Sequence, residues 1–330
     1  MKHILNRLIN HEHISKEEAK RVLVNISMGE YNQSQIASFL TVYMMRSITT
    51  NELEGFRDAL LELCLAVDFS EYNTIDLCGT GGDGKDTFNI STLASFITAG
   101  AGVNVTKHGN YGVSSVSGSS NVLEHLGVAF TNDSGFLERC LENAGICILH
   151  APLFHPAMKN VAPIRRELGV KTFFNMLGPM VNPAFPKNQL VGVFSLELAR
   201  LYGYLYQNTD KNFTILHALD GYDEISLTCD TKVISNGMET MISPEDFGVQ
   251  QIKQSDIFGG NTIKEAADIF VNILEGNGTK AQNNVVCANA AMAIATVKGT
   301  SISDGFEAAK ASLASGEALK RLQTLITLSA

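Results

Sequence analysis

The segment TIDLCGTGGDGKDTFNIS, residues 74–91, contains the residue types that bind a phosphate group. Four glycines lie between positions 79 and 84 with Asp83 among them, and Thr87, Asn89 and Ser91 lead into an apolar run. The apolar residues on either side predict a strand, a glycine loop and a helix in that order. This arrangement gathers unpaired backbone N–H groups and the positive end of a helix dipole at one point. A tight turn would need fewer glycines, so we expect an anion site here.

Two generic nucleotide motifs overlap this loop, and each of them lacks an essential part. The spacing G-x-G-x-x-G at residues 79–84 matches the dinucleotide fingerprint, but no acidic residue stands between Asp86 and Glu124 to hold the ribose hydroxyls. The spacing G-x-x-x-x-G-K, ending at Lys85, approaches the nucleoside-triphosphate loop, but Asp86 replaces the hydroxyl residue that ligates Mg²⁺. The sequence therefore argues against NAD and against a P-loop, and leaves another phosphate ligand.

A second polar segment, KHGN at residues 107–110, follows the apolar stretch 103–106 that predicts a strand. Ligands of open α/β sheets bind beyond the carboxyl ends of the strands, where this segment would lie. The serines and glycines that continue to Ser120 offer many hydrogen-bond donors with little bulk, and residues 117–120 precede a predicted helix. A polar loop without a ligand is the alternative, and the Lys–His pair at the strand end makes it the weaker interpretation.

Three basic side chains, His155, Arg165 and Arg166, accompany a predicted helix over residues 156–168, which Pro163 should kink or break. Neighbouring helix positions are about 100° apart, so at most one of the two arginines faces a given pocket. An arginine fork pairs with a carboxylate through two hydrogen bonds. One of these arginines would therefore suit recognition of an acidic substrate.

Two adjacent carboxylates, Asp223 and Glu224, follow Gly221 after a predicted strand. Such pairs are most often exposed charge, and alone they argue only weakly for a metal. Hard cations prefer clustered oxygen ligands, and Mg²⁺ commonly bridges phosphates to one or two carboxylates. A pyrophosphate held elsewhere would therefore favour a metal role for this pair.

The apolar pattern predicts the elements that position these segments. Residues 1–68 predict three amphipathic helices, two of which begin at the capping boxes of Ser15 and Thr49. Strands and helices then alternate, which indicates an α/β fold with a mostly parallel sheet flanked by helices. We expect a small all-helical domain over 1–68, joined by a segment near 170–185, and a larger α/β domain over 69–330. The expected strands are 75–78, 103–106, 146–149, 191–194 and 213–218, with a strand meander within 222–248.

The bulk composition narrows the class of partner. The 330 residues are 45% hydrophobic and 18% charged, and the formal net charge of −9 argues against nonspecific nucleic-acid binding. The six cysteines form no CxxC pair, and we interpret them as reduced. The N-terminal stretch lacks a signal-peptide core, and no apolar run approaches the roughly 20 residues that span a bilayer. We expect a cytoplasmic protein that binds neither nucleic acid nor membrane.

Taken together, these segments resemble the anthranilate phosphoribosyltransferase family of tryptophan biosynthesis over nearly the whole chain. Each matching run is weak alone, but their combination, order and spacing are specific. The resemblance implies an N-terminal helical domain, a larger α/β domain and a homodimer formed through the N-terminal helices. The matching runs are DLCGTGGDG-x-x-TFNIST (76–92), KHGN (107–110), SS-x-SGS (114–119), HPAM-x-x-V-x-P-x-RRELG (155–169), T-x-FN-x-LGP-x-x-NPA (172–184) and GYDEIS (221–226).

The resemblance also implies substrates and roles for the matching residues. The substrates would be phosphoribosyl pyrophosphate and anthranilate, with two Mg²⁺ ions, and no side chain would act as a catalytic acid, base or nucleophile. The residues implied for the donor are Gly79, Gly82, Asp83, Thr87, Asn89, Ile90, Ser91, Thr92, Lys107, His108, Gly109, Asn110, Tyr111, Gly112, Val113, Ser114, Ser115 and Ser119. Those implied for anthranilate are Gly79, Asn110 and Arg165, with His108, His155 and Gly178 lining its path. Those implied for Mg²⁺ are Ser91, Asp223 and Glu224.

The chain departs from the family pattern in one loop. It has Tyr111 and Gly112 where many members have Arg-Ser, Val116 where they have Lys, and Asn121 where they have Asp. Two cationic positions are therefore absent. Their absence would weaken phosphate affinity or alter closure of the loop.

Two other functions fit parts of the pattern. A pyrimidine-nucleoside phosphorylase of the same superfamily would share the architecture, but Asn110 and Arg165 favour an aromatic acid over a base. A non-catalytic phosphoribosyl-binding regulator would keep the phosphate loops but could lose Asp223 and Glu224, which are present. Phosphoribosyl transfer needs no strong base, because an aromatic amine is neutral at pH 7. Positioning and electrostatic stabilisation should therefore dominate.

Overall fold

The computed structural model describes residues 1–112 and 117–330. The chain forms two compact units, which are described separately: unit 1 is Met1–Val67 with Ala151–Phe185, and unit 2 is Asp68–His150 with Pro186–Ala330. The segment that returns to unit 1 is longer than the stretch near 170–185 that the sequence indicates. Four positions named in the sequence analysis lie outside the described residues: Val113, Ser114, Ser115 and Val116.

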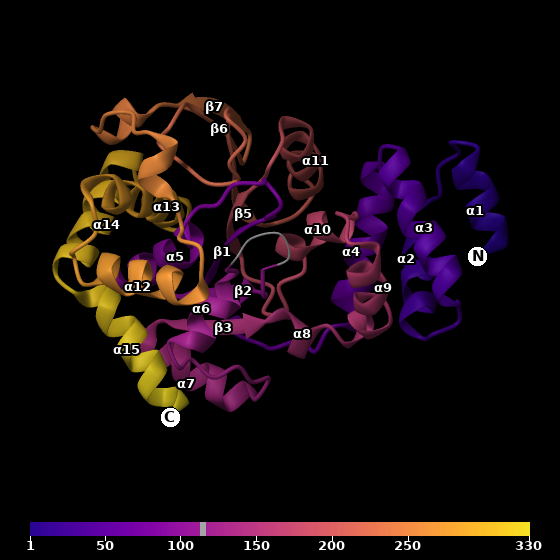
Figure 1. The fold of residues 1–330 in the computed structure, drawn as a ribbon, viewed down its shortest axis with the longest axis horizontal. Helices are drawn as coiled ribbons and strands as arrows, with labels where there is room; N and C mark the ends of the chain where they lie inside the picture. Colours follow the sequence, from indigo (N-terminus) through magenta and orange to yellow (C-terminus); the bar gives the residue numbers. More distant parts are fainter. Residues whose placement is uncertain (113–116) are drawn as a thin grey trace. The chain divides into compact units, whose positions relative to one another are not determined.

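Unit 1 is helical, as the sequence predicts (Figure 1). The capping boxes at Ser15 and Thr49 are confirmed, and Asn32 forms a third one. Pro163 stands in the first turn of a helix, so the expected break within 156–168 is confirmed. The first helix is absent from the sequence analysis. The elements are α1 (Lys2–Ile9), α2 (Lys16–Ser27), α3 (Gln33–Met45), α4 (Thr50–Leu63), α8 (Ala151–Phe154), η1 (Pro156–Asn160), α9 (Ala162–Leu168), α10 (Phe174–Leu177) and η2 (Gly178–Met180).

An aromatic cluster ties the returning segment into unit 1. Phe173 stacks on Phe56 with ring centroids 4.4 Å apart. It meets Phe39 and Tyr43 edge-on, at 6.1 and 5.3 Å. All four side chains are buried, and such ring pairs contribute about 0.5–1.5 kcal/mol each beyond the area they bury. The N-terminal helices therefore bury their apolar faces partly against a segment from much later in the chain.

A buried carboxylate lies in the same unit. Glu52 is 0% exposed, and its Oε1 lies 2.9 Å from Nη1 of Arg46, whose side chain is 4% exposed. The same oxygen accepts the hydroxyl of Tyr43 at 3.1 Å and the N–H of Ile14 at 3.2 Å. Oε2 accepts the N–H of Thr49 at 2.9 Å. Glu52 therefore has a cation and several hydrogen-bond donors, which a buried charge requires.

Unit 2 is built on a seven-stranded sheet in the order β3-β2-β1-β4-β5-β6-β7 (Figure 1). Parallel pairs join the strands from β3 to β5, and β6 and β7 add an antiparallel hairpin. The predicted mostly parallel sheet is thus confirmed, while the expected meander within 222–248 reduces to the hairpin. The strands are β1 (Ile75–Gly79), β2 (Val105–Gly109), β3 (Ile146–His150), β4 (Asn188–Gly192), β5 (Asn212–Ala218), β6 (Thr231–Ser235) and β7 (Met238–Ile242).

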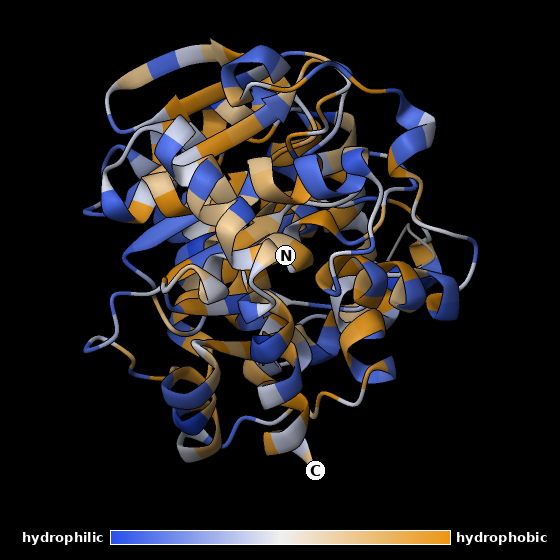
Figure 2. Cartoon of the chain, turned by 90° about the vertical axis from the view of Figure 1, so that its left-hand side faces the viewer, coloured by the Kyte–Doolittle hydropathy of each residue, from blue (hydrophilic) through white to orange (hydrophobic). Residues whose placement is uncertain are grey.

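Helices flank this sheet, and two of them are buried over most of their length. Residues 93–99 of α5 and 285–294 of α13 are buried, whereas the outer helices show hydrophilic and hydrophobic residues in turn (Figure 2). No single helix among the described residues is long and apolar enough to cross a membrane, and only α13 with α14, bent by 118°, pass that test as a pair. The helices are α5 (Ile90–Gly100), α6 (Ser119–His125), α7 (Ser134–Ala144), α11 (Leu196–Tyr206), η3 (Pro244–Phe247), η4 (Gln254–Ile257), α12 (Ile263–Leu274), α13 (Lys280–Lys298), α14 (Ile302–Ala314) and α15 (Glu317–Ser329).

The order of the strands changes direction between β1 and β4. The chain moves from β1 outward to β3 and then returns to place β4 on the other side of β1. Ligands of open α/β sheets bind beyond the carboxyl ends of the strands at such a point. Gly192 ends β4 there, and a Cβ on it would lie 1.4 Å from the carbonyl oxygen of Asp223. Glycine at this position lets the segment that carries Asp223 cross the end of the strand.

Candidate active site

The glycine loop runs from Gly79, at the end of β1, to Ile90, at the start of α5. The predicted order of strand, loop and helix is confirmed. Gly81, Gly82 and Gly84 have φ angles of +64°, +74° and +75°. Residues with a Cβ rarely adopt this left-handed region, so the path of the loop needs glycine at three positions.

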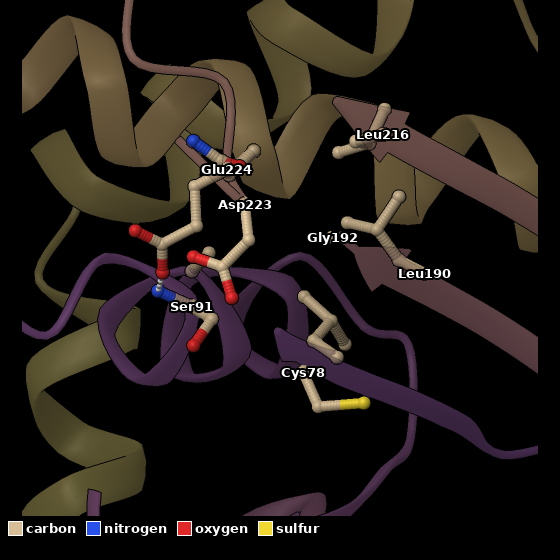
Figure 3. Close-up of a pocket in the computed structure, with 10 residues that line it drawn as sticks. Cys78, Ser91, Leu190, Gly192, Leu216, Asp223 and Glu224 are labelled. Carbon is tan, nitrogen blue, oxygen red and sulfur yellow. Dashed lines mark hydrogen bonds between the residues drawn. The ribbon is translucent and has the colours of Figure 1, made fainter. Parts of the chain in front are cut away.

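Asp223 and Glu224 meet this loop from the segment between β5 and β6. Oδ2 of Asp223 accepts the N–H of Gly81 at 2.7 Å. Oε1 of Glu224 accepts the N–H of Ser91 at 2.9 Å, a bond visible in Figure 3. A Cβ on Gly79 would lie 2.3 Å from Oδ2 of Asp223, so this approach also needs glycine. Backbone donors that hold a carboxylate at a helix N-terminus can equally hold a phosphate.

One small pocket brings together the three residues predicted for Mg²⁺. Ser91, Asp223 and Glu224 all line it, and Cys78 turns its Sγ away from the carboxylates (Figure 3). The other lining residues are Leu77, Ala94, Leu190, Gly192, Leu216 and Asn289. Apolar side chains thus line part of the pocket that the two acidic groups enter.

The carboxyl groups of this pocket hold their protons more tightly than ordinary acids. Burial raises the pKa of Asp223 to about 7, and the charge of Asp83 adds to the shift. The pKa of Glu224 is raised well above its usual range by burial and then by the charges of Asp223 and Asp83. Burial also raises the pKa of Asp83. Three crowded carboxylates repel one another, and a divalent cation between them would relieve that repulsion.

The protein alone does not complete a metal site in this pocket. Within residues 1–112 and 117–330, no group of three or more His, Cys, Asp and Glu side chains is arranged to hold a metal ion. Mg²⁺ characteristically takes one or two carboxylates together with water and substrate phosphates. Asp223 and Glu224 therefore fit Mg²⁺ if a phosphate ligand supplies the remaining oxygens.

Lys107 and His108 lie within β2 rather than in a loop after it. Lys107 is 2% exposed, its Nζ donates to the carbonyl of Leu77 at 2.7 Å, and burial lowers its pKa. Asp76 in β1 accepts the N–H of His108 at 3.1 Å, and its charge partly offsets the burial of Lys107. Asp76 is not among the predicted site residues, although an acid inside a predicted buried strand is an unusual signal.

Five of the residues predicted for the donor lie near the start of α5, namely Thr87, Asn89, Ile90, Ser91 and Thr92. Asn89 is the N-cap residue of α5, and its Nδ2 donates to the carbonyl of Ser117 at 3.2 Å. Ile90 and Thr92 are buried, which leaves Asn89 and Ser91 as the accessible side chains of that turn. Thr87 forms an isolated antiparallel bridge with Phe258.

Tyr111, Gly112 and Asn121, three of the four positions at which we expect a departure from the family pattern, make defined contacts in unit 2. Oδ1 of Asn121 accepts the N–H groups of Gly112 and Gly118, at 2.9 and 3.0 Å. The hydroxyl of Tyr111 donates to Glu124 at 3.1 Å, and its ring meets His150 edge-on at 4.7 Å. Ser119 and Asn110, both predicted for the donor, are joined by a 3.2 Å bond from Ser119 Oγ to the carbonyl of Asn110. Asn121 thus joins the two described ends of this loop, a role that the sequence analysis does not foresee.

The unit 1 residues that the sequence predicts for an acidic substrate lie in the returning segment, Ala151–Phe185. Nη2 of Arg165 donates to Oδ1 of Asn175 at 3.2 Å, and its guanidinium lies 5.3 Å from the ring centre of Phe174. Arg166 is exposed, which agrees with the expectation that the two arginines face different ways. Burial lowers the pKa of Arg165 and lowers that of His155 to about 4, so His155 is neutral at pH 7.

Gly178 begins the short helix η2 of unit 1. A Cβ placed on it would meet no atom within 4 Å. Packing within the described structure therefore does not require glycine at this position, unlike at Gly79 or Gly192.

A glycosyl transferase family matches this chain in two parts. The α/β domain of that family matches residues 71–319, and its helical bundle domain matches residues 2–64. The two matches follow one another in the order expected from the sequence, with the helical part first. They account for most of the chain.

Curated proteins and solved structures indicate one group of enzymes within this glycosyl transferase family. Anthranilate phosphoribosyltransferase from Flavobacterium psychrophilum is 74% identical over 329 residues, covering 100% of each chain, and that from Bacteroides thetaiotaomicron is 53% identical, covering 99% of each. The Thermus thermophilus enzyme superposes with a TM-score of 0.91 at 32% identity, covering 98% of both chains. The Saccharomyces cerevisiae enzyme in complex with PRPP and Mg superposes at 0.90 with 26% identity, covering 98% of this chain and 96% of that one. The chain belongs to the anthranilate phosphoribosyltransferase family.

Proposed function

We propose that this protein transfers the 5-phosphoribosyl group from phosphoribosyl pyrophosphate to the amine of anthranilate, in tryptophan biosynthesis. The products are N-(5-phosphoribosyl)anthranilate and pyrophosphate. The observation that carries the proposal is the site at the end of β1. There the glycine loop, the first turn of α5 and the carboxylates of Asp223 and Glu224 meet. The 74% identity over the full length to an anthranilate phosphoribosyltransferase agrees with this proposal.

The reaction needs charge stabilisation more than proton transfer. The bond from the ribose carbon to pyrophosphate breaks with its electron pair leaving on pyrophosphate, and the amine nitrogen of anthranilate forms the new bond before losing a proton. Backbone N–H groups of the glycine loop would stabilise the phosphate oxygens. In the described structure, those of Gly81 and Ser91 donate to Asp223 and Glu224. Bound Mg²⁺ would neutralise charge on the leaving group. No side chain is assigned as acid, base or nucleophile.

The donor and the metal would occupy unit 2. We propose two Mg²⁺ ions held by Ser91, Asp223 and Glu224, and a donor held by the glycine loop, the start of α5 and the loop after β2. Magnesium in the yeast complex with PRPP supports the metal. The residues proposed for the donor are Gly79, Gly82, Asp83, Thr87, Asn89, Ile90, Ser91, Thr92, Lys107, His108, Gly109, Asn110, Tyr111, Gly112, Val113, Ser114, Ser115 and Ser119.

Anthranilate would be recognised through its carboxylate. A structure of the yeast enzyme with 4-fluoroanthranilate, 25% identical with a TM-score of 0.87, supports this class of acceptor. We propose Arg165 as the residue that pairs with the carboxylate, with Asn110 and Gly79 contacting the acceptor and His108, His155 and Gly178 lining its path. Burial of Arg165 would strengthen such a pair.

Replacing Arg165 by Ala should raise the KM for anthranilate by about 10- to 100-fold, since hydrogen bonds to charged groups contribute about 1.5–3 kcal/mol. The KM for the phosphoribosyl donor should change little. Steady-state kinetics with each substrate varied in turn measures both. The exposed neighbour provides a matched control, and Arg166→Ala should alter neither KM more than about twofold. Equal effects of Arg165→Ala on both substrates would argue against a carboxylate contact.

One assay tests the proposed reaction directly. Purified protein with Mg²⁺, phosphoribosyl pyrophosphate and anthranilate should consume the fluorescence of anthranilate. The second arm supplies thymidine or uridine with phosphate. Phosphorolysis of a nucleoside without loss of anthranilate would reject the proposal in favour of a nucleoside phosphorylase.

We also propose a homodimer formed through the N-terminal helices, in the cytoplasm. Exposed apolar side chains on α1 and α3 and at the C-cap of α2 support an interface there, namely Ile9, Met44, Met45 and Met28. Sedimentation velocity would show a dimer, and a monomer at all concentrations would reject the interface.

A further inference from the structure

The segment between β5 and β6, residues 219–230, carries the two carboxylates but belongs to no helix or strand. It therefore lacks the regular backbone pairing that fixes the strands beside it. Leu227 within it has a φ of +59°, a left-handed conformation that costs a residue with a Cβ about 1–2 kcal/mol. Such a path persists only where the surroundings hold it in place.

One side chain of α13 holds this segment next to the carboxylates. Oδ1 of Asn289 accepts the N–H of Ile225 at 3.0 Å, and its Nδ2 donates to the carbonyl of Ile225 at 2.9 Å. Nδ2 also donates to the carbonyl of Val285 at 2.9 Å, one turn earlier in α13. The amide therefore pairs with both backbone groups of Ile225, as a neighbouring strand would, and is anchored to its own helix.

The position of this contact connects it to the proposed chemistry. Ile225 follows Glu224 directly, and Glu224 reaches the N–H of Ser91 at 2.9 Å. Asn289 is 3% exposed and lines the pocket that Asp223 and Glu224 enter. Thr228 donates to Asp220 at 2.5 Å, which closes the segment on itself without joining it to another element. Movement of Ile225 would therefore displace the adjoining carboxylates.

We propose that Asn289 is a positioning residue that fixes Asp223 and Glu224 at the first turn of α5 and so sets the Mg²⁺ affinity of the site. This inference rests on the proposed function, because it takes the two carboxylates as metal ligands. Groups that orient metal-binding carboxylates change metal affinity or activity by about 10- to 100-fold when removed. Asn289 touches neither substrate nor metal in this proposal, and acts through the backbone of Ile225.

The test is a Mg²⁺ titration of Asn289→Ala. The Mg²⁺ concentration for half-maximal anthranilate consumption, at saturating substrates, should rise by about 10-fold or more. Binding of Mn²⁺ in the presence of pyrophosphate, followed by electron paramagnetic resonance, should weaken by a similar factor without turnover. Asn289→Asp keeps the acceptor for the N–H of Ile225 and loses the donors, so its shift should be smaller. If Asn289→Ala fails to fold, the Mg²⁺ titration of Asn289→Asp still tests the positioning role.

The matched control is another asparagine of the same helix. Nδ2 of Asn283 donates to the carbonyl of Gly278 at 3.2 Å, away from the carboxylates, so Asn283→Ala should keep the wild-type Mg²⁺ titration. Lower thermal stability and lower kcat with an unchanged Mg²⁺ titration would overturn the proposal, as would an equal shift in Asn283→Ala. The variant Asp223→Asn/Glu224→Gln distinguishes failure of the proposed metal role from failure of the positioning role of Asn289. If it too leaves the titration unchanged, the proposed metal role fails; if it shifts while Asn289→Ala and Asn289→Asp do not, only the positioning role fails.

Discussion

Substitution of Asp223 by Asn together with Glu224 by Gln should lower activity at about 1 mM Mg²⁺ on the order of 100-fold, because metal stabilisation of a leaving phosphate contributes several kcal/mol. The amides keep the shape of the side chains, and their oxygens can still accept the N–H groups of Gly81 and Ser91. They lose the negative charge that attracts the cation. A Mg²⁺ titration of anthranilate consumption measures the effect, and higher Mg²⁺ should recover part of the activity.

Two exposed carboxylates of unit 2 give the control for this substitution. Glu138 and Glu142 on α7 share the hydroxyl of Tyr72 and lie outside the pocket. The variant Glu138→Gln/Glu142→Gln should therefore titrate with Mg²⁺ as the wild type does. An unchanged titration in Asp223→Asn/Glu224→Gln would remove both residues from the proposed metal site.

The same carboxylates make Mg²⁺ binding dependent on pH. Asp223 has a pKa of about 7 without metal, above the ordinary value of about 3.9. Mg²⁺ binds the deprotonated form, so the Mg²⁺ concentration for half-maximal activity should rise roughly tenfold between pH 8 and pH 6. Folding raises the pKa of Asp223, so without metal its carboxyl group contributes to the free energy of unfolding most fully below its ordinary pKa of about 3.9. That contribution is lost as the pH rises through 7. The double variant should lose the pH dependence of the titration.

Replacing Arg46 by Met should lower the free energy of unfolding by about 3–5 kcal/mol, because it leaves a buried carboxylate without its cation. Glu52 would keep the donors of Tyr43, Ile14 and Thr49 but lose the guanidinium 2.9 Å away. Urea unfolding monitored by circular dichroism measures the change, provided that the transition of unit 1 is resolved.

Two further variants test whether the loss of stability arises because the ion pair of Arg46 and Glu52 is buried. Lys20 and Glu62 form an exposed pair in the same unit, so Lys20→Met should cost at most about 1 kcal/mol. Combining Arg46→Met with Glu52→Gln removes the stranded charge and should restore part of the stability. If Arg46→Met proves as mild as Lys20→Met, Glu52 does not depend on Arg46.

Local patterns in the sequence predict the part of the site that local chemistry determines. The glycines at 81, 82 and 84 mark a left-handed path, and the capping residues Ser15 and Thr49 mark helix starts. Both depend on neighbours within a few positions. The approach of Asp223 to the loop is different, because it requires β1 and β5 to be placed in one sheet first. The resemblance to a family, rather than spacing, joins those segments in advance.

The contacts that local patterns do not predict join residues far apart along the chain. Asn289 is one polar residue in an Ala-rich helix, and only the folded structure brings it to Ile225. Asp76 likewise binds the N–H of His108, 32 positions later in the chain. The bonds from Nδ2 of Asn160 to the carbonyls of Ile26 and Ser27 connect residues before 170 to unit 1, which therefore takes in more than the stretch near 170–185. No periodicity within a window of sequence can indicate such partners.

The return of the chain to unit 1 bears on the order of events during synthesis. When the ribosome has released residues 1–67, the partner ring of Phe56 has not yet been made, because Phe173 comes after the first three strands of unit 2. Until then, the rings of Phe39, Tyr43 and Phe56 lack their contacts with Phe173. Residues 68–172 must be translated during that interval, so we expect chaperones that bind exposed aromatic surface to act before residue 173 emerges.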